Sequence, residues 1–333
     1  MILTQTPVFN ASGNDRLEDR KIVGGSTTGI ADLNDVKFTW APPLYRTMMN
    51  NHWIPEKVDL TPDKQTRRRM SSAEEEANQY VTSFLIVLDS MQTTALPHLG
   101  GYISAPEVKA CYDLQLFQER VHTQAYQYGL QTFYNFTERE RIYNLWREDT
   151  LLLERNLFIA KNYQAFIDSP SVDNFNTMLY ADYVMEGIFF YIGFRFFNTL
   201  ASRGIQVEWN KNITYIERDE NTHCNLIIQT IKEIGMTSSD QDKLVNIIKE
   251  GIAQELNWNS HKIGNNILGI SDVQNEEYLK FMGNKRARAV GLKNIYPNAT
   301  KNPYAHLEVE VKGNFFETTI TEYNQSASGF EDF

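Results

Sequence analysis

Two copies of the pattern Glu-x-x-His constrain most strongly what this chain can fold into. They are Glu119–His122 and Glu220–His223, and each lies in a long stretch whose apolar residues recur at helical spacing. Residues three apart lie on the same face of an α-helix, so each pair would present a carboxylate and an imidazole together. One such pair arises often by chance, and a lone histidine is more often a hydrogen-bonded core residue than a ligand. Two pairs on two long helices indicate a metal site with oxygen and nitrogen ligands.

Two further acids lie within strongly apolar segments. Asp89 is part of FLIVLDSM, and Glu186 is part of VMEGIFFYIGF. A buried carboxylate is costly unless it is paired or bound to metal. Taken singly, Asp89 could cap a helix end and Glu186 could lie on an exposed face. Taken together, four helices each supply a carboxylate and two of them add a histidine, which is the arrangement of di-iron and di-manganese helical bundles.

The spacing of apolar residues along the chain predicts an all-α fold. Helical spacing of apolar residues runs through most of the chain between about 64 and 290, and neither strand alternation nor an internal repeat interrupts it. The 333 residues would allow one large or two medium domains, and the uniform pattern favours one helical domain over residues 46–304. The long helical stretches are 74–96, 105–134, 138–167, 175–204, 211–235 and 239–264.

Both ends of the chain differ from this helical region. Residues 1–45 are rich in Gly, Ser, Thr, Asn and Pro, which predicts an irregular or loosely attached N-terminal arm. Residues 305–333 are acidic and read as a flexible tail, in which HLEVEVK could form a short strand. The tail could be simply disordered, or it could dock on a partner and order there. Its aromatic residues beside acidic ones, as in SGFEDF, favour docking.

Composition narrows the class of protein. A net charge of −10 disfavours nucleic acid as a partner, because phosphate binding requires basic patches. Two cysteines imply no disulfide framework and suit a reducing cytoplasm. The N-terminus MILTQTPVFN lacks the features of a secretory signal, and no apolar run reaches the roughly 20 residues of a membrane span. We therefore expect a cytoplasmic protein with no nucleic-acid or membrane partner.

A tyrosine lies close to the predicted ligands. Tyr126 follows Glu119 by seven residues, which returns it to the ligand face of the same helix. Phe190, Phe194 and Ile216 lie at helical spacing from Glu186 and Glu220 and could line an apolar pocket around the phenol. The alternative is that all four residues are ordinary core residues. A dry pocket would protect an oxidised tyrosine from quenching.

At this point the sequence resembles the small, radical-generating subunit of class I ribonucleotide reductase, a member of the ferritin-like superfamily of dimetal-carboxylate proteins. The resemblance runs from about Trp53 to Tyr304, some three quarters of the chain, and returns at the tail. Its order and spacing agree, including the 34 residues from Glu186 to Glu220. The matching segments are HWIPEKVDL, LDSMQ, FQERVHTQAY, VMEGIFFY, ERDENTH, and NKRARAVGL followed by NPY.

The resemblance implies a role for each matched residue. The six metal ligands would be Asp89, Glu119, His122, Glu186, Glu220 and His223, holding a dinuclear centre of Fe or Mn. Tyr126 would carry the radical, in a pocket formed by Phe190, Phe194 and Ile216. Trp53 and Asp219 would begin the radical-transfer route through His122, and Tyr323 in the tail would relay the radical onward.

The resemblance also implies partners and a reaction. The chain would form a homodimer and dock through its C-terminal tail on a large subunit, which reduces ribonucleotides to the deoxyribonucleotides needed for DNA replication. Oxygen or a reduced oxygen species would activate the metal centre. The chain would have no nucleotide site of its own, and it contains no glycine-rich phosphate loop.

Three other functions are compatible with parts of the pattern. A dimetal oxidase or monooxygenase that is not coupled to a large subunit would explain the ligands but not Trp53, Asp219 and the acidic tail. A ferritin-like storage protein would bind many metal ions per chain. A helical scaffold without metal would bind none.

Overall fold

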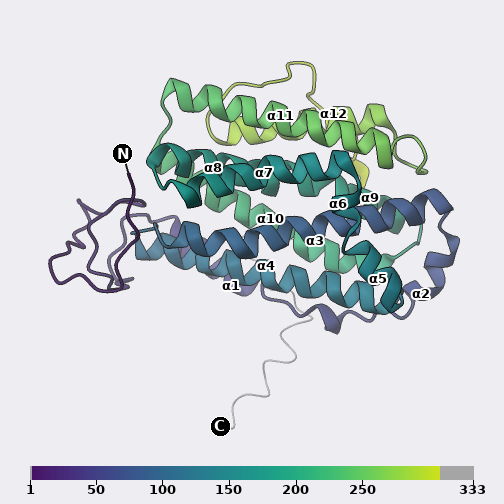
Figure 1. The fold of residues 1–333 in the computed structure, drawn as a ribbon, viewed down its shortest axis with the longest axis horizontal. Coiled ribbons are helices and arrows are strands. Elements are labelled where there is room, and N and C mark those ends of the chain that lie inside the picture. Colours follow the sequence, from purple (N-terminus) through teal and green to yellow (C-terminus); the bar gives the residue numbers. More distant parts are fainter. Residues whose placement is uncertain (1, 308–333) are drawn as a thin grey trace, which may run out of the picture.

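Long helices that pack side by side make up most of the structure, a computed structural model that describes residues 2–307 (Figure 1). Within this range no strand forms, and only two isolated bridges are present, Ile2 with Ser171 and Val23 with Ile103. The predicted all-α class is therefore confirmed. The longest elements are α3 (Ser72–Gly100), α4 (Pro106–Phe133), α10 (Val207–Ile234) and α11 (Ser238–Lys262).

Helix ends follow local capping chemistry. The Ser71 hydroxyl accepts from the Glu74 backbone N–H at 3.2 Å, and the Glu74 carboxylate accepts from the Ser71 N–H at 2.8 Å, so a capping box begins α3. Thr237 and Asp240 begin α11 in the same way. Gly235 follows α10 with a φ of +79°, a conformation that glycine adopts without strain.

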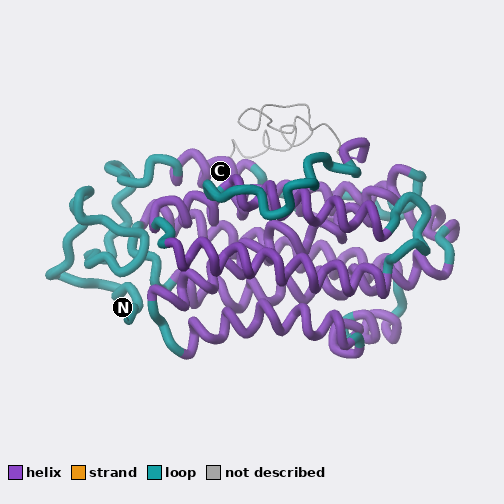
Figure 2. The backbone as a smooth tube through the Cα atoms, turned by 90° about the horizontal axis from the view of Figure 1, so that it is seen from above, coloured by secondary structure: helices purple, strands orange, loops and turns teal. Residues whose placement is uncertain are grey.

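The helices form layers (Figures 1 and 2). Helices α3 and α4 are joined by a short turn and pack against each other, and α1 (Ala41–Asn50) and α10 also contact α4. Helix α10 in turn contacts α8 (Val172–Val184) and α9 (Phe190–Ser202). Helix α7 (Thr150–Asp168) packs against α8, α11 and α3, and α11 packs against α12 (Asp272–Ala289). The centre of the bundle therefore lies between α3, α4, α8 and α10.

Two stretches that read as continuous helices are interrupted in the structure. Residues 138–167 divide among α5 (Phe136–Ile142), α6 (Leu145–Glu148) and α7. Asp149 ends one helix and caps the next, because its carboxylate accepts from the Leu152 N–H at 2.9 Å. Residues 175–204 contain a π-helical turn, Met185–Phe189, between α8 and α9. Single π turns of this kind occur frequently at functional sites.

Residues 2–40 lie against one end of the bundle (Figure 1). Residues 2–40 contain no helix, and α1 begins at Ala41, slightly before the boundary expected at 45. Arg20 forms a buried ion pair with Glu107 at 3.2 Å, and Glu107 also accepts from the Lys37 backbone N–H at 3.0 Å. The arm is thus attached to the start of α4 by a buried charge pair.

The short elements are α2 (Asp63–Thr66) and the 3₁₀ turns η1 (Pro55–Lys57), η2 (Arg67–Arg69) and η4 (Ala305–Leu307). Within residues 2–307, no helix combines the length and apolar character needed to cross a membrane. Tyr323, the SGFEDF end and most of the expected HLEVEVK strand lie outside the described residues.

Candidate metal centre

The structure brings all six predicted ligands together in the middle of the bundle. They come from α3, α4, the π turn and α10, and each is 0% exposed. Their donor atoms form two overlapping groups that could each hold a metal ion. The first group is Asp89, Glu119, His122 and Glu220, and the second is Glu119, Glu186, Glu220 and His223.

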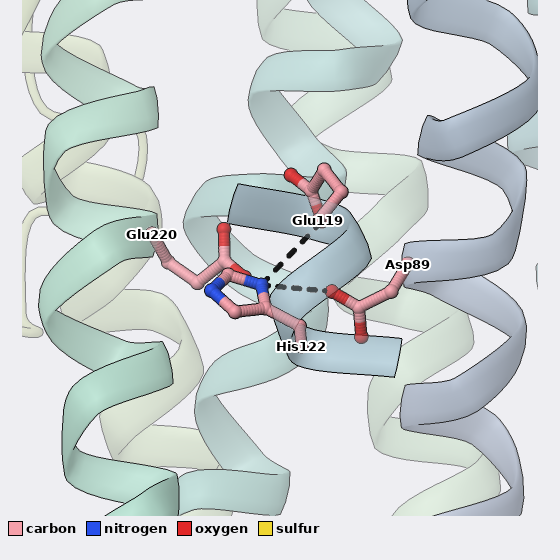
Figure 3. Close-up of side chains that lie close together, drawn as sticks. All are labelled: Asp89, Glu119, His122 and Glu220. Atoms are coloured by element: carbon pink, nitrogen blue, oxygen red, sulfur yellow. Dashed lines mark hydrogen bonds and ion pairs between the residues drawn. The ribbon is translucent and has the colours of Figure 1, made fainter. Parts of the chain in front are cut away.

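In the first group, three carboxylates surround one imidazole nitrogen (Figure 3). Nδ1 of His122 lies 3.1 Å from Oδ1 of Asp89, 3.3 Å from Oε1 of Glu220 and 3.5 Å from Oε2 of Glu119. Because a neutral imidazole nitrogen and carboxylate oxygens are typical ligands of Fe and Mn, this convergence can hold one cation.

In the second group, Nδ1 of His223 has the equivalent position. It lies 2.8 Å from Oε2 of Glu220, 3.2 Å from Oε1 of Glu119 and 3.4 Å from Oε2 of Glu186. Glu119 and Glu220 thus direct one oxygen to each histidine. This division between the two groups is the geometry that a bridging carboxylate requires.

Charge and hydrogen bonding both fit a dinuclear centre. Neither oxygen of Glu119 makes a hydrogen bond, nor do Oδ2 of Asp89 and Oε1 of Glu220, although all are buried. Such atoms are costly in a protein interior unless a cation satisfies them. The four carboxylates carry four negative charges when ionised, and two divalent cations would balance them while both histidines stay neutral.

Without cations, the cluster must retain protons. Burial raises the pKa of Asp89, and burial together with the charges of Glu186 and Glu119 raises that of Glu220. Burial opposes the charged form of Glu119 as well, but the charges and hydrogen bonds of His223 and His122 together outweigh it and lower this pKa. Burial likewise opposes the charged form of His223, yet the charges of Glu220, Glu186 and Glu119 raise its pKa. Protons therefore compete with metal for these atoms.

The second nitrogen of each histidine has a fixed partner. Nε2 of His122 lies 3.3 Å from Oδ2 of Asp219, and the Trp53 indole N–H donates to that same oxygen at 2.9 Å. Nε2 of His223 lies 3.1 Å from the Gln118 side-chain oxygen. An acceptor at Nε2 holds the proton there and leaves the Nδ1 lone pair facing the cluster. The structure thus connects Trp53 and His122 by hydrogen-bonding contacts to the same oxygen of Asp219.

Tyr126 is buried on α4. Its hydroxyl makes no hydrogen bond, and burial followed by the Asp89 charge raises its pKa well above the usual value. Phe190, Phe194 and Ile216 are each 0% exposed, and the two phenyl rings stack at 5.8 Å. The phenol is therefore neutral and excluded from water.

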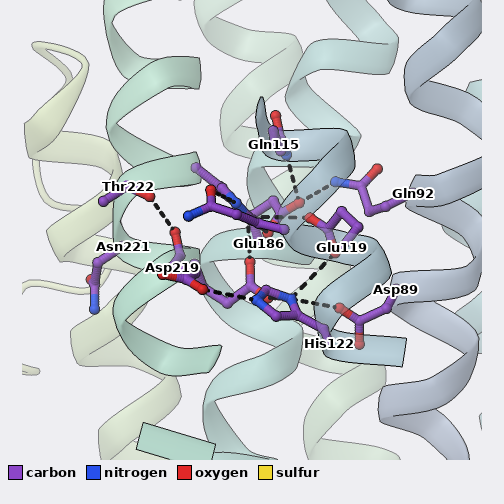
Figure 4. Close-up of polar contacts among 12 residues, drawn as sticks. Asp89, Gln92, Gln115, Glu119, His122, Glu186, Asp219, Asn221 and Thr222 are labelled. Atoms are coloured by element: carbon purple, nitrogen blue, oxygen red, sulfur yellow. Dashed lines mark hydrogen bonds and ion pairs between the residues drawn. The ribbon is translucent and has the colours of Figure 1, made fainter. Parts of the chain in front are cut away.

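Several residues around Glu186 were not predicted from the sequence. The side-chain amides of Gln92 and Gln115 both donate to Oε1 of Glu186, the latter at 3.0 Å (Figure 4). Helical spacing could have identified them, since Gln92 lies three residues after Asp89 and Gln115 four before Glu119. Gln118 could have been found in the same way, since it lies four residues before His122.

Two buried arginines hold the π turn that carries Glu186. Nε of Arg286 on α12 donates to the Gly187 carbonyl at 2.9 Å, and Nη2 of Arg155 on α7 donates to the Phe189 carbonyl at 3.1 Å. A π turn disturbs the regular i to i−4 pairing of the backbone, so its carbonyls need other partners. These contacts bridge long sequence separations, and no local pattern predicts them.

Sequence comparisons identify similar proteins. Residues 30–303 match the family described as "Ribonucleotide reductase, small chain". The chain is 37% identical over 345 residues to the ribonucleoside-diphosphate reductase subunit beta of Treponema pallidum, covering 99% of this chain and 98% of the relative. It is 31% identical over 324 residues to the protein of the same description from Halalkalibacterium halodurans, covering 93% and 94%.

Solved structures show the same bundle. The ribonucleotide reductase R2 subunit from Clostridium botulinum superposes with a TM-score of 0.89 at 36% identity, covering 96% of this chain and 100% of that one. The dimanganese(II)-NrdF of Streptococcus sanguinis superposes with a TM-score of 0.72 at 17% identity, covering 80% and 93%, and this similarity concerns the fold alone. The predicted ferritin-like bundle with a carboxylate site in its core is confirmed.

Proposed function

The chain belongs to the small-chain family of ribonucleotide reductases, and we propose that its carboxylate–histidine cluster binds two metal ions and forms the oxidising equivalent used by a large subunit. It has the function of the beta subunit of ribonucleoside-diphosphate reductase, an oxidoreductase that works with a large-subunit partner. The single observation that most supports the metal site is the division of the Glu119 and Glu220 oxygens between His122 and His223.

The six buried residues are the ligands in this proposal. Asp89 and His122 would hold one ion, Glu186 and His223 the other, and Glu119 and Glu220 would bridge them. The ions are Fe or Mn, because both accept mixed carboxylate and imidazole ligands. When bound, the metal pair supplies the oxidising equivalent after reaction with oxygen or a reduced oxygen species.

Side chains of the protein then orient the metal ligands, exclude water and transfer the oxidising equivalent. Asp219 accepts the Nε2–H of His122 and so presents Nδ1 to the metal. Tyr126 is the proposed radical residue, supported by its complete burial and its position seven residues after Glu119. Radical transfer would leave the cluster through His122, Asp219 and Trp53.

The remaining steps take place beyond the described residues. Tyr323 would receive the radical, and the C-terminal tail would dock on the large subunit, where the ribonucleotide is reduced. A homodimer in the cytoplasm is part of the same proposal. The cytoplasmic location is supported by Cys111 and Cys224, which are both buried and unpaired.

Metal analysis combined with EPR, on protein loaded separately with Fe(II) and Mn(II), tests this function. We expect about two ions per chain and, after oxygen exposure, either a tyrosyl radical that is lost in Tyr126→Phe or an EPR signal from the oxidised metal pair. Neither signal in wild-type protein would contradict the proposal. Many ions per chain would indicate storage, and no uptake would indicate a scaffold. Oxidation without turnover in the presence of the large subunit would favour an uncoupled oxidase.

A further inference from the structure

A buried polar array extends from the cluster toward α7, on the side of Glu186. Its members are Gln92 on α3, Asp182 on α8 and Tyr163 on α7, with exposed fractions of 0%, 1% and 4%. None of them belongs to the predicted ligand set or to the Trp53 route. The array therefore has no role in the function as described so far.

Hydrogen bonding fixes the orientation of the Gln92 amide at the centre of this array. Its nitrogen donates to Oδ1 of Asp182 at 2.7 Å and to Oε1 of Glu186. Its oxygen accepts from the Tyr163 hydroxyl at 3.0 Å, and that hydroxyl also lies 3.0 Å from Oδ1 of Asp182. A flipped amide would direct its oxygen at two carboxyl groups and lose the bond from Tyr163. The array thus directs an N–H toward Glu186.

The side chains of the array are neutral. Burial, and next the charge of Glu186, raises the pKa of Asp182 well above the usual value, so Asp182 holds a proton at neutral pH. The Tyr163 phenol is also neutral, because burial raises its pKa well above the usual value. A charged Asp182 would repel the Glu186 carboxylate, whereas a neutral Asp182 does not.

The two oxygens of Glu186 consequently have different surroundings. Oε1 accepts from both Gln92 and Gln115, while Oε2 lies 3.4 Å from Nδ1 of His223. Two N–H donors on one oxygen direct its lone pairs away from the metal position. Only Oε2 then faces the second group.

We propose that Gln92, held by Tyr163 and Asp182, is a positioning residue that keeps Glu186 monodentate through Oε2. A chelating Glu186 would use two coordination positions on the second metal ion, and a monodentate one uses a single position. The array would thereby leave a position open for the small oxidant that activates the centre. This inference rests on the proposed dimetal function.

The test compares Mn(II)-loaded crystals of the wild type with those of Gln92→Leu, Tyr163→Phe and Thr93→Val. Thr93 is the matched control, since it is a buried polar residue adjacent to Gln92 whose hydroxyl bonds only to the Ser90 carbonyl. In the wild type and Thr93→Val, we expect one Glu186 oxygen within bonding distance of the second ion. Gln92→Leu should bring both oxygens into bonding distance, and Tyr163→Phe should do so partially.

A solution measurement keeps the test decisive if one variant crystallises poorly or is unstable. Near-infrared magnetic circular dichroism of the Fe(II)-loaded proteins reports coordination number, and we expect it to rise at one of the two sites in Gln92→Leu and Tyr163→Phe only. Unchanged monodentate binding and coordination number in both variants would overturn the inference. Failure of the wild type to bind two ions would overturn the dimetal proposal instead, so the two failures are distinguishable.

Discussion

The indole N–H of Trp53 and Nε2 of His122 meet at a single atom, Oδ2 of Asp219, at 2.9 and 3.3 Å. Trp53 and Asp219 lie 166 positions apart in the sequence, and both are buried. The other Asp219 oxygen, Oδ1, accepts from Arg218 at 3.0 Å. Burial opposes the charged form of Asp219, but the Arg218 charge helps to lower its pKa, so an ionised carboxylate joins Trp53 to His122.

Replacing Asp219 with Asn should separate metal binding from radical transfer. The amide keeps the size of the side chain but removes the charge that holds the His122 proton at Nε2. We expect about two metal ions per chain and a radical after oxygen exposure, with turnover in the presence of the large subunit reduced by roughly 10²-fold or more. Trp53→Phe should behave similarly. Normal turnover in both variants would contradict the proposed route.

Tyr126→Phe should abolish a tyrosyl radical without disturbing the bundle. The Tyr126 hydroxyl makes no hydrogen bond, so its removal leaves no buried partner unsatisfied. We expect unchanged metal content and an unfolding temperature within a few degrees of the wild type. EPR after oxygen exposure provides the measurement, and a persisting tyrosyl signal would assign the radical to another tyrosine.

The buried ion pair between Arg155 and Glu255 should be important for stability. Arg155 lies between the rings of Phe84 and Phe189, at 4.4 and 4.3 Å, and both charged groups are fully buried. Arg155→Met leaves the Glu255 carboxylate without its partner, and the expected loss in unfolding free energy is about 3–5 kcal/mol. Urea denaturation of the metal-free protein measures it. The double variant Arg155→Met with Glu255→Leu should lose less, and an equal or larger loss would contradict this account.

The Cys111 thiol should be inert in the folded protein. Burial raises its pKa to about 12, against about 8.5 for a free thiol. At pH 8 the thiolate fraction, and with it alkylation by iodoacetamide, should be roughly 10³-fold lower than in the unfolded chain. The thiol's contribution to stability is present below about pH 8.5 and is lost as the pH rises toward 12. Mass spectrometry of labelled peptides tests this, and rapid labelling of native Cys111 would contradict it.

Deleting the residues after about 320 should abolish activity with the large subunit and leave the metal centre unaffected. The cluster lies within residues 89–223, so metal content and radical yield should stay at wild-type levels. Activity with the large subunit should disappear, because the proposed docking segment and Tyr323 are removed. A turnover assay with added large subunit measures the effect, and normal turnover of the truncated chain would rule out docking through the tail.

The clustering of the six proposed ligands could be predicted because each lies in a long sequence stretch with a clear helical pattern of apolar residues. For Asp89 and Glu186, the signal was an acid inside an apolar segment, and burial of both is observed. The π turn around Glu186 gave no such signal, since MEGIF suits an α-helix equally well. Its conformation depends on Arg155 and Arg286, which reach it from distant helices. The Gln92 array likewise depends on packing between α3, α7 and α8.

The N-terminal arm connects two helical hairpins of the bundle. The Leu3 N–H donates to the Pro170 carbonyl at 3.0 Å, in the turn between α7 and α8. The Thr6 N–H donates to the Gly101 carbonyl at 2.7 Å, in the turn between α3 and α4. One short, helix-free segment therefore ties two helical hairpins together at their turns. We therefore expect that opening either hairpin loosens the other, and that this end of the bundle unfolds as one cooperative unit that spans residues far apart in the sequence.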